Sequence, residues 1–212
     1  MPDFQLEKLY SQPVIGVDEV GRGPIAGPVV SCACVFFNNS LPIEELRLIN
    51  DSKKLSSIQR EKALEFILKM KKENVLDFRI GFASVKEIDK LNIVNAVVFS
   101  MKRAIKKLQI KQGTIIIDGN VKFEVEKFLC ISFIKGDQIS LSIAAASIIA
   151  KVHRDRYMAK IGRNYPHFKW DTNAGYGTVG HRHQIELKGI TKHHRKSFEP
   201  IKTFIQYNIS TC

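Results

Sequence analysis

Short apolar runs that end abruptly in carboxylates constrain this chain most. Residues 14–17 read Val-Ile-Gly-Val and are followed at once by Asp18 and Glu19, and residues 114–117 read Thr-Ile-Ile-Ile and are followed by Asp118. Apolar runs of this length are typical of buried strands, whereas acids are disfavoured within strands. Side chains at strand ends commonly line a site just outside the sheet. The pattern therefore predicts a sheet with carboxylates gathered along one edge.

The order of the remaining patterns predicts an α/β fold with a mixed sheet flanked by helices. Two apolar runs joined by a Gly- and Pro-rich turn at 21–24 indicate an antiparallel hairpin. Later strands alternate with segments of helical periodicity, and a small helical part follows. We expect one domain over 13–160 and a C-terminal helical segment over 161–212. Strands are expected at 13–20, 27–37, 78–85, 114–117 and 130–134, and helices at 56–72 (capped by Ser56 or Ser57), 85–108, 140–157, 180–187 and 200–205.

The charge balance favours a polyanionic partner. Lys and Arg number 33 against 21 Asp and Glu, a formal net charge of +12, and residues 151–212 hold 12 basic against 4 acidic side chains. Basic proteins bind nucleic acid because phosphate contacts release counterions. A solvated lysine surface gives the same balance, so charge alone leaves both interpretations open.

Nothing in the chain predicts a membrane span or a secretory signal. No apolar run reaches about 18 residues, and residues 1–12 lack an apolar core, so we expect a cytoplasmic protein. Cys32 and Cys34 lie two apart and share one face if they form a strand. They could form half of a metal site, but no second pair at zinc-finger spacing follows. Two small buried side chains in a reduced protein are the simpler interpretation.

Four acids suggest metal-dependent phosphodiester hydrolysis. Asp137 opens an Ala-rich helix and joins Asp18, Glu19 and Asp118. Clustered carboxylates repel unless a cation neutralises them, and oxygen ligands suit magnesium or manganese. Two such ions, about 4 Å apart, can activate water and stabilise a leaving oxygen. Each acid singly also suits a solvated loop or a helix cap. Neighbours in a strand face opposite ways, so Asp18 and Glu19 share a site only where the strand bends or ends.

Several other segments have a functional and a structural interpretation. The glycine loop at 21–27 lacks dinucleotide-binding spacing; it could let a nucleic-acid strand approach closely or simply form a hairpin turn. Lys53 precedes a helix and could contact phosphate or lie in an exposed charged turn. Tyr176, between two glycines, could stack on a base or sugar, or pack over its loop. The histidines match no usual zinc spacing, and the segment 193–195 is expected to add to a basic surface.

The combination of these segments resembles ribonuclease HII, of the type 2 ribonuclease H family. The segments 16–24 (Gly-Val-Asp-Glu-Val-Gly-Arg-Gly-Pro) and 26–30 look like the family's opening signature. The similarity runs from about Val14 to about Pro200. The segments that follow in the family's order are 51–55, 117–120, 135–137, 144–152 with Arg154 and Asp155, 175–178 and 194–198.

The resemblance implies an RNase H-like fold with a C-terminal helical part and a two-metal site for Mg²⁺ or Mn²⁺. Asp18 would bridge both ions, Asp137 would bind one, and Glu19 and Asp118 would bind the other. These four acids are thus the expected catalytic and metal-binding residues.

It also implies how substrate is held. The backbone of Gly21, Arg22 and Gly23 would hold the ribonucleotide, and Tyr176 would sense the 2′-hydroxyl that distinguishes RNA from DNA. The implied enzyme is an endonuclease that hydrolyses the RNA strand of RNA–DNA hybrids, and we expect a monomer. It would also cut 5′ to single ribonucleotides in duplex DNA, leaving 3′-hydroxyl and 5′-phosphate ends, a DNA-repair reaction.

Three alternatives remain at this point. Ribonuclease HIII usually carries an additional N-terminal domain, whereas about a dozen residues precede the first expected strand here, and the loop reads Gly-Arg-Gly as in ribonuclease HII. A non-catalytic basic nucleic-acid-binding module explains the charge but not the acids. A carboxylate metalloenzyme acting on small molecules explains the acids but not the basic C-terminal part.

Overall fold

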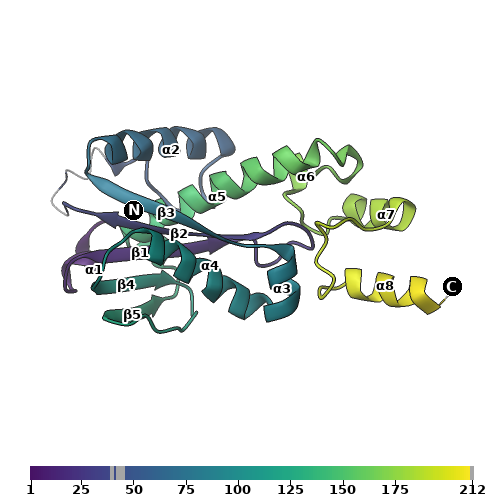
Figure 1. Cartoon of the computed structure of the whole chain (residues 1–212). Coiled ribbons are helices and arrows are strands. Elements are labelled where there is room, and N and C mark those ends of the chain that lie inside the picture. Colours follow the sequence, from purple (N-terminus) through teal and green to yellow (C-terminus); the bar gives the residue numbers. More distant parts are fainter. Residues whose placement is uncertain (39–40, 42–45, 211–212) are drawn as a thin grey trace.

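The computed structural model describes residues 1–38, 41 and 46–210, which form a mixed five-stranded sheet covered by helices (Figure 1). The strand order is β3-β2-β1-β4-β5. Strand β2 is antiparallel to both of its neighbours, β1 and β3, whereas β1, β4 and β5 run parallel to one another. The expected α/β class, the mixed sheet and the N-terminal hairpin are therefore confirmed. The strands are β1 (Val14–Val20), β2 (Val29–Phe36), β3 (Leu76–Ala83), β4 (Gly113–Asp118) and β5 (Phe128–Phe133).

Helices cover both faces of the sheet. One core contains α2 (Ser57–Lys72) and α5 (Leu141–Gly162), and the other contains α4 (Ile93–Lys107) with Ile88 of α3 (Val85–Leu91). Cys32 and Cys34 are fully buried in the first core. They are small core side chains, as the simpler interpretation had it, while Cys212 lies outside the described residues.

The C-terminal part is built from short helices that lie beyond the end of the sheet (Figure 1). They are α6 (Trp170–Asn173), α7 (Val179–Lys188) and α8 (Ile201–Ser210), and α7 and α8 match the two expected helical pieces. A further short helix, α1 (Gln5–Lys8), was not expected from the sequence. None of the described helices is long and apolar enough to cross a membrane.

The expected single helix over 85–108 is wrong. Asn92 has φ 64° and ψ 168°, so it ends α3, and its side chain accepts a hydrogen bond from the amide of Asn95 to begin α4. Asn tolerates positive φ and is a favoured N-cap, so one residue performs both functions. The helix expected over 140–157 instead extends to Gly162. Of the two possible caps of α2, Ser56 is the one that forms a capping box, with Gln59.

Close packing of α5 on β1 requires a glycine at position 16. A Cβ there would lie 2.3 Å from the carbonyl carbon of Ser142 and 2.4 Å from the amide nitrogen of Ile143. Backbone cannot yield as a flexible side chain can, so α5 must sit directly on the strand that carries Asp18.

We expect Gly16→Ala to lower the free energy of unfolding by about 1–3 kcal/mol through overpacking. The matched control is Gly180→Ala in α7, where nothing lies within 4 Å of the added methyl group. That control should be neutral or stabilising by up to about 1 kcal/mol, because alanine favours the helix. Urea unfolding of the two variants checks this, and equal effects would contradict the close-packing argument.

Candidate active site

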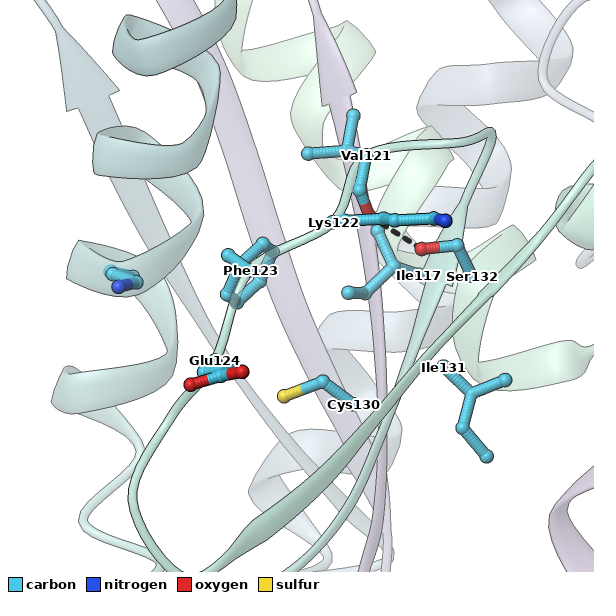
Figure 2. A pocket seen from close by; sticks show the side chains of 9 residues that line it. Ile117, Val121, Lys122, Phe123, Glu124, Cys130, Ile131 and Ser132 are labelled. Atoms are coloured by element: carbon cyan, nitrogen blue, oxygen red, sulfur yellow. Dashed lines mark hydrogen bonds between the residues drawn. The ribbon is translucent and has the colours of Figure 1, made fainter.

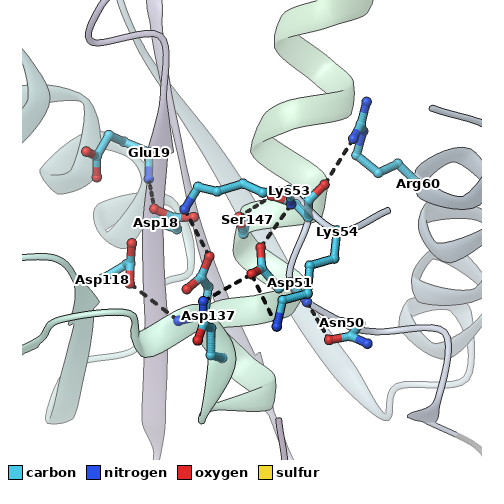
Figure 3. A network of polar contacts seen from close by, with 12 residues as sticks. Asp18, Glu19, Asn50, Asp51, Lys53, Lys54, Arg60, Asp118, Asp137 and Ser147 are labelled. Carbon is cyan, nitrogen blue, oxygen red and sulfur yellow. Dashed lines mark hydrogen bonds and ion pairs between the residues drawn. The ribbon is translucent and has the colours of Figure 1, made fainter. Parts of the chain in front are cut away.

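The carboxyl ends of two parallel strands bring three acids together. Val17 of β1 is in register with Ile117 of β4, so Asp18 and Asp118 follow side by side at the same edge of the sheet. Asp137 comes from a 3₁₀ turn, η2 (Gly136–Gln138), just before α5. Its amide donates a 3.4 Å hydrogen bond to Asp118 Oδ1 (Figure 3). The fold therefore gathers acids from separate parts of the chain.

Asp18 and Glu19 keep the alternating directions of a strand. β1 stays paired with β2 through Val20, so the strand runs through both acids and ends one residue later. The Asp18 carboxylate accepts a 2.7 Å hydrogen bond from the Glu19 amide, and the two side chains point apart (Figure 3). Because the strand ends so soon, both carboxylates still line one pocket.

Burial and mutual repulsion oppose ionisation of these acids. Burial, followed by the charges of Glu19 and Asp118, raises the pKa of Asp18 well above its ordinary value. Burial raises the pKa of Glu19 although the Arg22 guanidinium opposes it. Burial and the charge of Asp137 raise the pKa of Asp118. The site therefore favours a bound cation, which would stabilise all of these charges at once.

Basic side chains contact the carboxylates. Lys53 Nζ lies 3.1 Å from Asp137 Oδ2, and an Arg22 guanidinium nitrogen lies 3.3 Å from Glu19 Oε1. Within the described part of the chain, no three His, Cys, Asp or Glu side chains are oriented so that they could hold a metal ion together. Yet Glu19 Oε2 and Asp137 Oδ1 are buried without any hydrogen-bond partner. Such orphaned carboxylate oxygens, in an all-oxygen donor set, fit a hard divalent cation.

A pocket of about 310 Å³ joins the acids to the expected substrate-binding residues. The glycine loop forms one wall, and Tyr176, about half exposed, stands beside it. A Cβ at Gly23 would lie 3.5 Å from the Tyr176 ring, so the ring and the loop backbone are neighbours. The expected site residues that line the pocket are Asp18, Glu19, Gly21, Arg22, Gly23, Lys53, Asp118 and Tyr176.

Asp137 belongs to the same network without lining this pocket. It connects through Lys53, and Gln138 beside it donates to Asp51, a buried acid that also accepts from the Lys53 amide (Figure 3). Asp51 therefore ties the segment carrying Lys53 to the turn that carries Asp137.

Sequence reasoning assigned no site role to four polar residues of the pocket, namely Ser52, Arg60, Ser147 and Lys151. Ser147 hydrogen-bonds Ser52 at 2.8 Å and contributes a hydrogen bond that lowers the pKa of Asp18. Ser147 and Lys151 are four residues apart in α5, so they share a helix face. That spacing, in a helix that begins beside Asp137, was the available clue.

A larger pocket, of about 730 Å³, is lined by none of the four acids, although Ile117 of β4 belongs to it (Figure 2). It is lined by the segment 121–124, by β5 residues including Cys130, and by Lys102 of α4. The Ser132 hydroxyl donates to the Val121 carbonyl at its rim. None of the expected site residues lines it, so size does not identify the functional pocket here.

The expectation that residues 193–195 extend a basic surface is wrong for two of the three. His194 and Arg195 are 1% and 0% exposed. His194 pairs with His181 through their Nε2 atoms at 3.1 Å, and the Arg195 guanidinium points to backbone carbonyls. These two side chains are buried and make hydrogen bonds inside the protein, and their partners lie too far away in the sequence for local patterns to indicate them.

Comparison with known proteins shows which family this chain is similar to. Residues 15–201 match the family model described as Ribonuclease HII. The protein named Ribonuclease HII from Wolbachia sp. subsp. Brugia malayi (strain TRS) is 48% identical over 204 residues, covering 94% of both chains. The crystal structure of ribonuclease H2 from Pyrococcus horikoshii OT3 is similar with a TM-score of 0.74 at 28% identity, covering 92% of this chain and 98% of that one.

A more distant likeness concerns the fold alone. The structure titled Bst-RNase HIII in complex with Mn²⁺ is similar with a TM-score of 0.65 at 18% identity, covering 95% of this chain and 71% of that one. It supports an RNase H-like arrangement of the mixed sheet and its flanking helices. With the family model spanning most of the sequence and relatives matching nearly end to end, this chain belongs to the ribonuclease HII family, hydrolytic nucleases that cut RNA within RNA–DNA hybrids.

Proposed function

We propose that this enzyme hydrolyses the RNA strand of RNA–DNA hybrids and also cuts 5′ to single ribonucleotides in duplex DNA. The products would carry 3′-hydroxyl and 5′-phosphate ends. The observation that carries the proposal is one pocket in which buried acids, a glycine loop and an exposed tyrosine meet. Family membership supports the hybrid substrate, and the loop with Tyr176 supports recognition of a lone ribonucleotide.

The proposed metal ligands are Asp18, Glu19, Asp118 and Asp137, holding two Mg²⁺ or Mn²⁺ ions. When bound, such ions lower the pKa of a water and stabilise charge on the leaving oxygen. The buried oxygens without partners on Glu19 and Asp137 support this assignment. The relative crystallised with Mn²⁺ shares the fold. No side chain need act as nucleophile.

Lys53 is proposed to exchange partners when substrate binds. Its ammonium now contacts Asp137, and three quarters of its side chain is exposed to solvent. A cation bound by the carboxylates would repel that ammonium, which could then contact a phosphate of the substrate. An exposed Lys is a suitable phosphate ligand because its charge sits on a long flexible chain.

The glycine loop and Tyr176 are proposed to select the ribonucleotide. Gly23 has no side chain, so a sugar can approach the loop backbone beside the Tyr176 ring. A ribose packed on that ring would place its 2′-hydroxyl against the loop. Selection by a hydrogen-bonded hydroxyl separates RNA from DNA strongly, because a deoxyribose leaves buried polar groups unpaired.

The surrounding chain is proposed to bind the rest of the duplex. The segment 161–212 is basic and adjoins the pocket through Tyr176, so we propose that it is the substrate-binding segment beside a catalytic domain over 13–160. We propose a monomer acting in the cytoplasm, because a single chain supplies both the residues that line the pocket and Asp137, which contacts Lys53 beside it.

Cleavage of a labelled DNA duplex with one central ribonucleotide tests the proposal. With Mg²⁺ or Mn²⁺ we expect a single cut on the 5′ side of that ribonucleotide, and a chelator should abolish it. Cutting only within runs of several ribonucleotides would reject the lone-ribonucleotide specificity. Tight duplex binding without any cutting would instead favour a binding module.

Tyr176→Ala should slow cleavage at a single ribonucleotide by about tenfold or more, because stacking on an aromatic ring contributes about 1–3 kcal/mol per nucleotide. Tyr176→Phe keeps the ring and is the matched control, so it should retain most of the activity. Steady-state rates on the one-ribonucleotide duplex check this. An unchanged rate for Tyr176→Ala would remove the proposed role of the ring.

A further inference from the structure

A buried arginine of the C-terminal segment forms hydrogen bonds with the backbone of the glycine loop. Arg195 is 0% exposed, and its guanidinium donates three hydrogen bonds to backbone carbonyls. They reach the carbonyl oxygens of Gly21 at 2.6 Å, Arg22 at 2.9 Å and Gly27 at 2.9 Å. Residues about 170 positions away in sequence are thus fixed by one planar group.

These contacts set the direction of the loop amides. In a planar trans peptide the carbonyl and the following N–H point opposite ways. Carbonyls of Gly21 and Arg22 directed at Arg195 therefore turn the N–H groups of Arg22 and Gly23 away from it. Neither N–H has a hydrogen-bond acceptor among the described residues, and both residues line the pocket. Two donors without a partner among the described residues therefore point away from Arg195, in residues that line the pocket.

Neighbouring contacts make the loop part of a single unit with the C-terminal segment. The Arg195 amide donates to the Ile25 carbonyl, and the Gly27 amide donates to the His193 carbonyl, both at 2.9 Å. Arg154, equally buried, binds the carbonyls of Ala26, Pro28 and Ala174. The Ala174 contact lies two residues from Tyr176, so both walls of the pocket share this support.

Burying the charged side chain of Arg195 costs free energy. Among the described residues its guanidinium donates to carbonyls, the negative charge of Asp89 only partly offsets the cost of burial, and the Phe198 ring centre lies 4.9 Å away. Burial, followed by the charge of Arg154, lowers the pKa of Arg195 to about 9, which leaves it protonated at neutral pH. A buried charge costs stability, but an apolar side chain at this position would leave the carbonyls of Gly21, Arg22 and Gly27 without this donor, so the guanidinium is the group that holds them.

We propose that Arg195 is a positioning residue for catalysis: its guanidinium fork fixes the loop carbonyls so that the amides of Arg22 and Gly23 point at the ribonucleotide. The inference deepens the proposed function and rests on it. It assigns to the C-terminal segment a direct part in shaping the pocket beside the acids, in addition to binding the duplex.

Arg195→Lys tests this, since one ammonium keeps the charge but cannot reach three carbonyls in the fork geometry. On the one-ribonucleotide duplex we expect kcat to fall about 10- to 100-fold, as expected for reactants misplaced by about 1 Å, with KM changed less than about threefold. Amide hydrogen exchange of residues 21–27 should accelerate while β1 stays protected. In Arg195→Ala, millimolar guanidinium ion should restore part of kcat.

Met101→Ala is the stability control. Met101 is fully buried in α4 and lines no part of the pocket, so truncating it destabilises the fold while the pocket residues and Arg195 stay unchanged. Assayed below their melting temperatures, Met101→Ala should keep the wild-type kcat and show no guanidinium rescue. A folded Arg195→Lys with wild-type kcat and unchanged loop exchange would overturn the inference. Absence of cutting by the wild-type protein would instead reject the proposed function, and loop exchange would still decide the role of Arg195.

Discussion

Replacing Asp118 by Asn should abolish most cutting while leaving duplex binding and folding intact. The amide is nearly isosteric and keeps an oxygen to accept the Asp137 amide hydrogen bond. It removes one negative charge from the proposed metal site, so we expect kcat to fall about 10²- to 10³-fold or more, a loss of about 3–4 kcal/mol of transition-state stabilisation. Cleavage rates of an RNA–DNA hybrid with Mg²⁺ measure the loss of cutting, and fluorescence anisotropy measures the duplex affinity separately.

Stability gives this prediction a second, independent readout. Burial and the charge of Asp137 raise the pKa of Asp118, so its ionised form is unfavourable in the protein without a cation. Asp118→Asn should therefore melt at the wild-type temperature or above when metal is chelated. Glu65→Gln, an exposed charge change on α2, is the control and should alter neither rate nor melting. Normal cutting by Asp118→Asn would reject the metal-site assignment.

The sheet and the clustering of the acids could be predicted because both depend on short-range patterns. The runs before Asp18 and Asp118 are apolar, and parallel strands place their carboxyl ends at one edge, so two local patterns specify a shared location. The break at Asn92 was missed because apolar periodicity continues on both sides of it. Only the positive φ that Asn tolerates separates α3 from α4.

The buried polar network could not be predicted, because each of its contacts joins distant segments. Arg195 binds carbonyls 173 and 174 residues away, and Lys53 reaches Asp137 across 84 residues. A cation in a basic segment is usually exposed, so composition favoured a basic surface at 193–195. Backbone carbonyls carry no side-chain identity, and a sequence gives no indication of which ones will accept a buried guanidinium.

Acidification should destabilise this protein through His194, a buried side chain. The Thr191 amide donates to His194 Nδ1, so the single proton of the neutral ring sits on Nε2 and is donated to His181 Nε2. That same atom of His181 accepts from Trp170 Nε1, so His181 carries its proton on Nδ1 and donates it to the Tyr176 carbonyl. The chain of hydrogen bonds requires both rings to be neutral.

The direction of the pH effect follows from the lowered pKa. Burial, followed by the neighbouring His181, lowers the pKa of His194 to about 3, whereas an unfolded His titrates near 6.5. Below about pH 6.5 the unfolded chain binds a proton that the folded chain does not. The free energy of unfolding contributed by this group is therefore complete above about pH 6.5 and falls by about 1.4 kcal/mol per pH unit as the pH drops towards 3.

Urea unfolding of wild type and His194→Gln between pH 7 and 4.5 measures this contribution. The acids with raised pKa values act in the opposite direction, but they are common to both proteins and cancel in the difference. The difference in free energy of unfolding between the two proteins should shrink by about 2.5 kcal/mol over that range, because only the wild type contains the buried imidazole that must stay neutral in the fold. His183→Gln, on an exposed side chain, should show the wild-type slope. If the free energies of unfolding of wild type and His194→Gln fall in parallel with pH, His194 does not stay neutral. The proton positions assigned to the hydrogen bonds from His194 through His181 to the Tyr176 carbonyl would then be wrong.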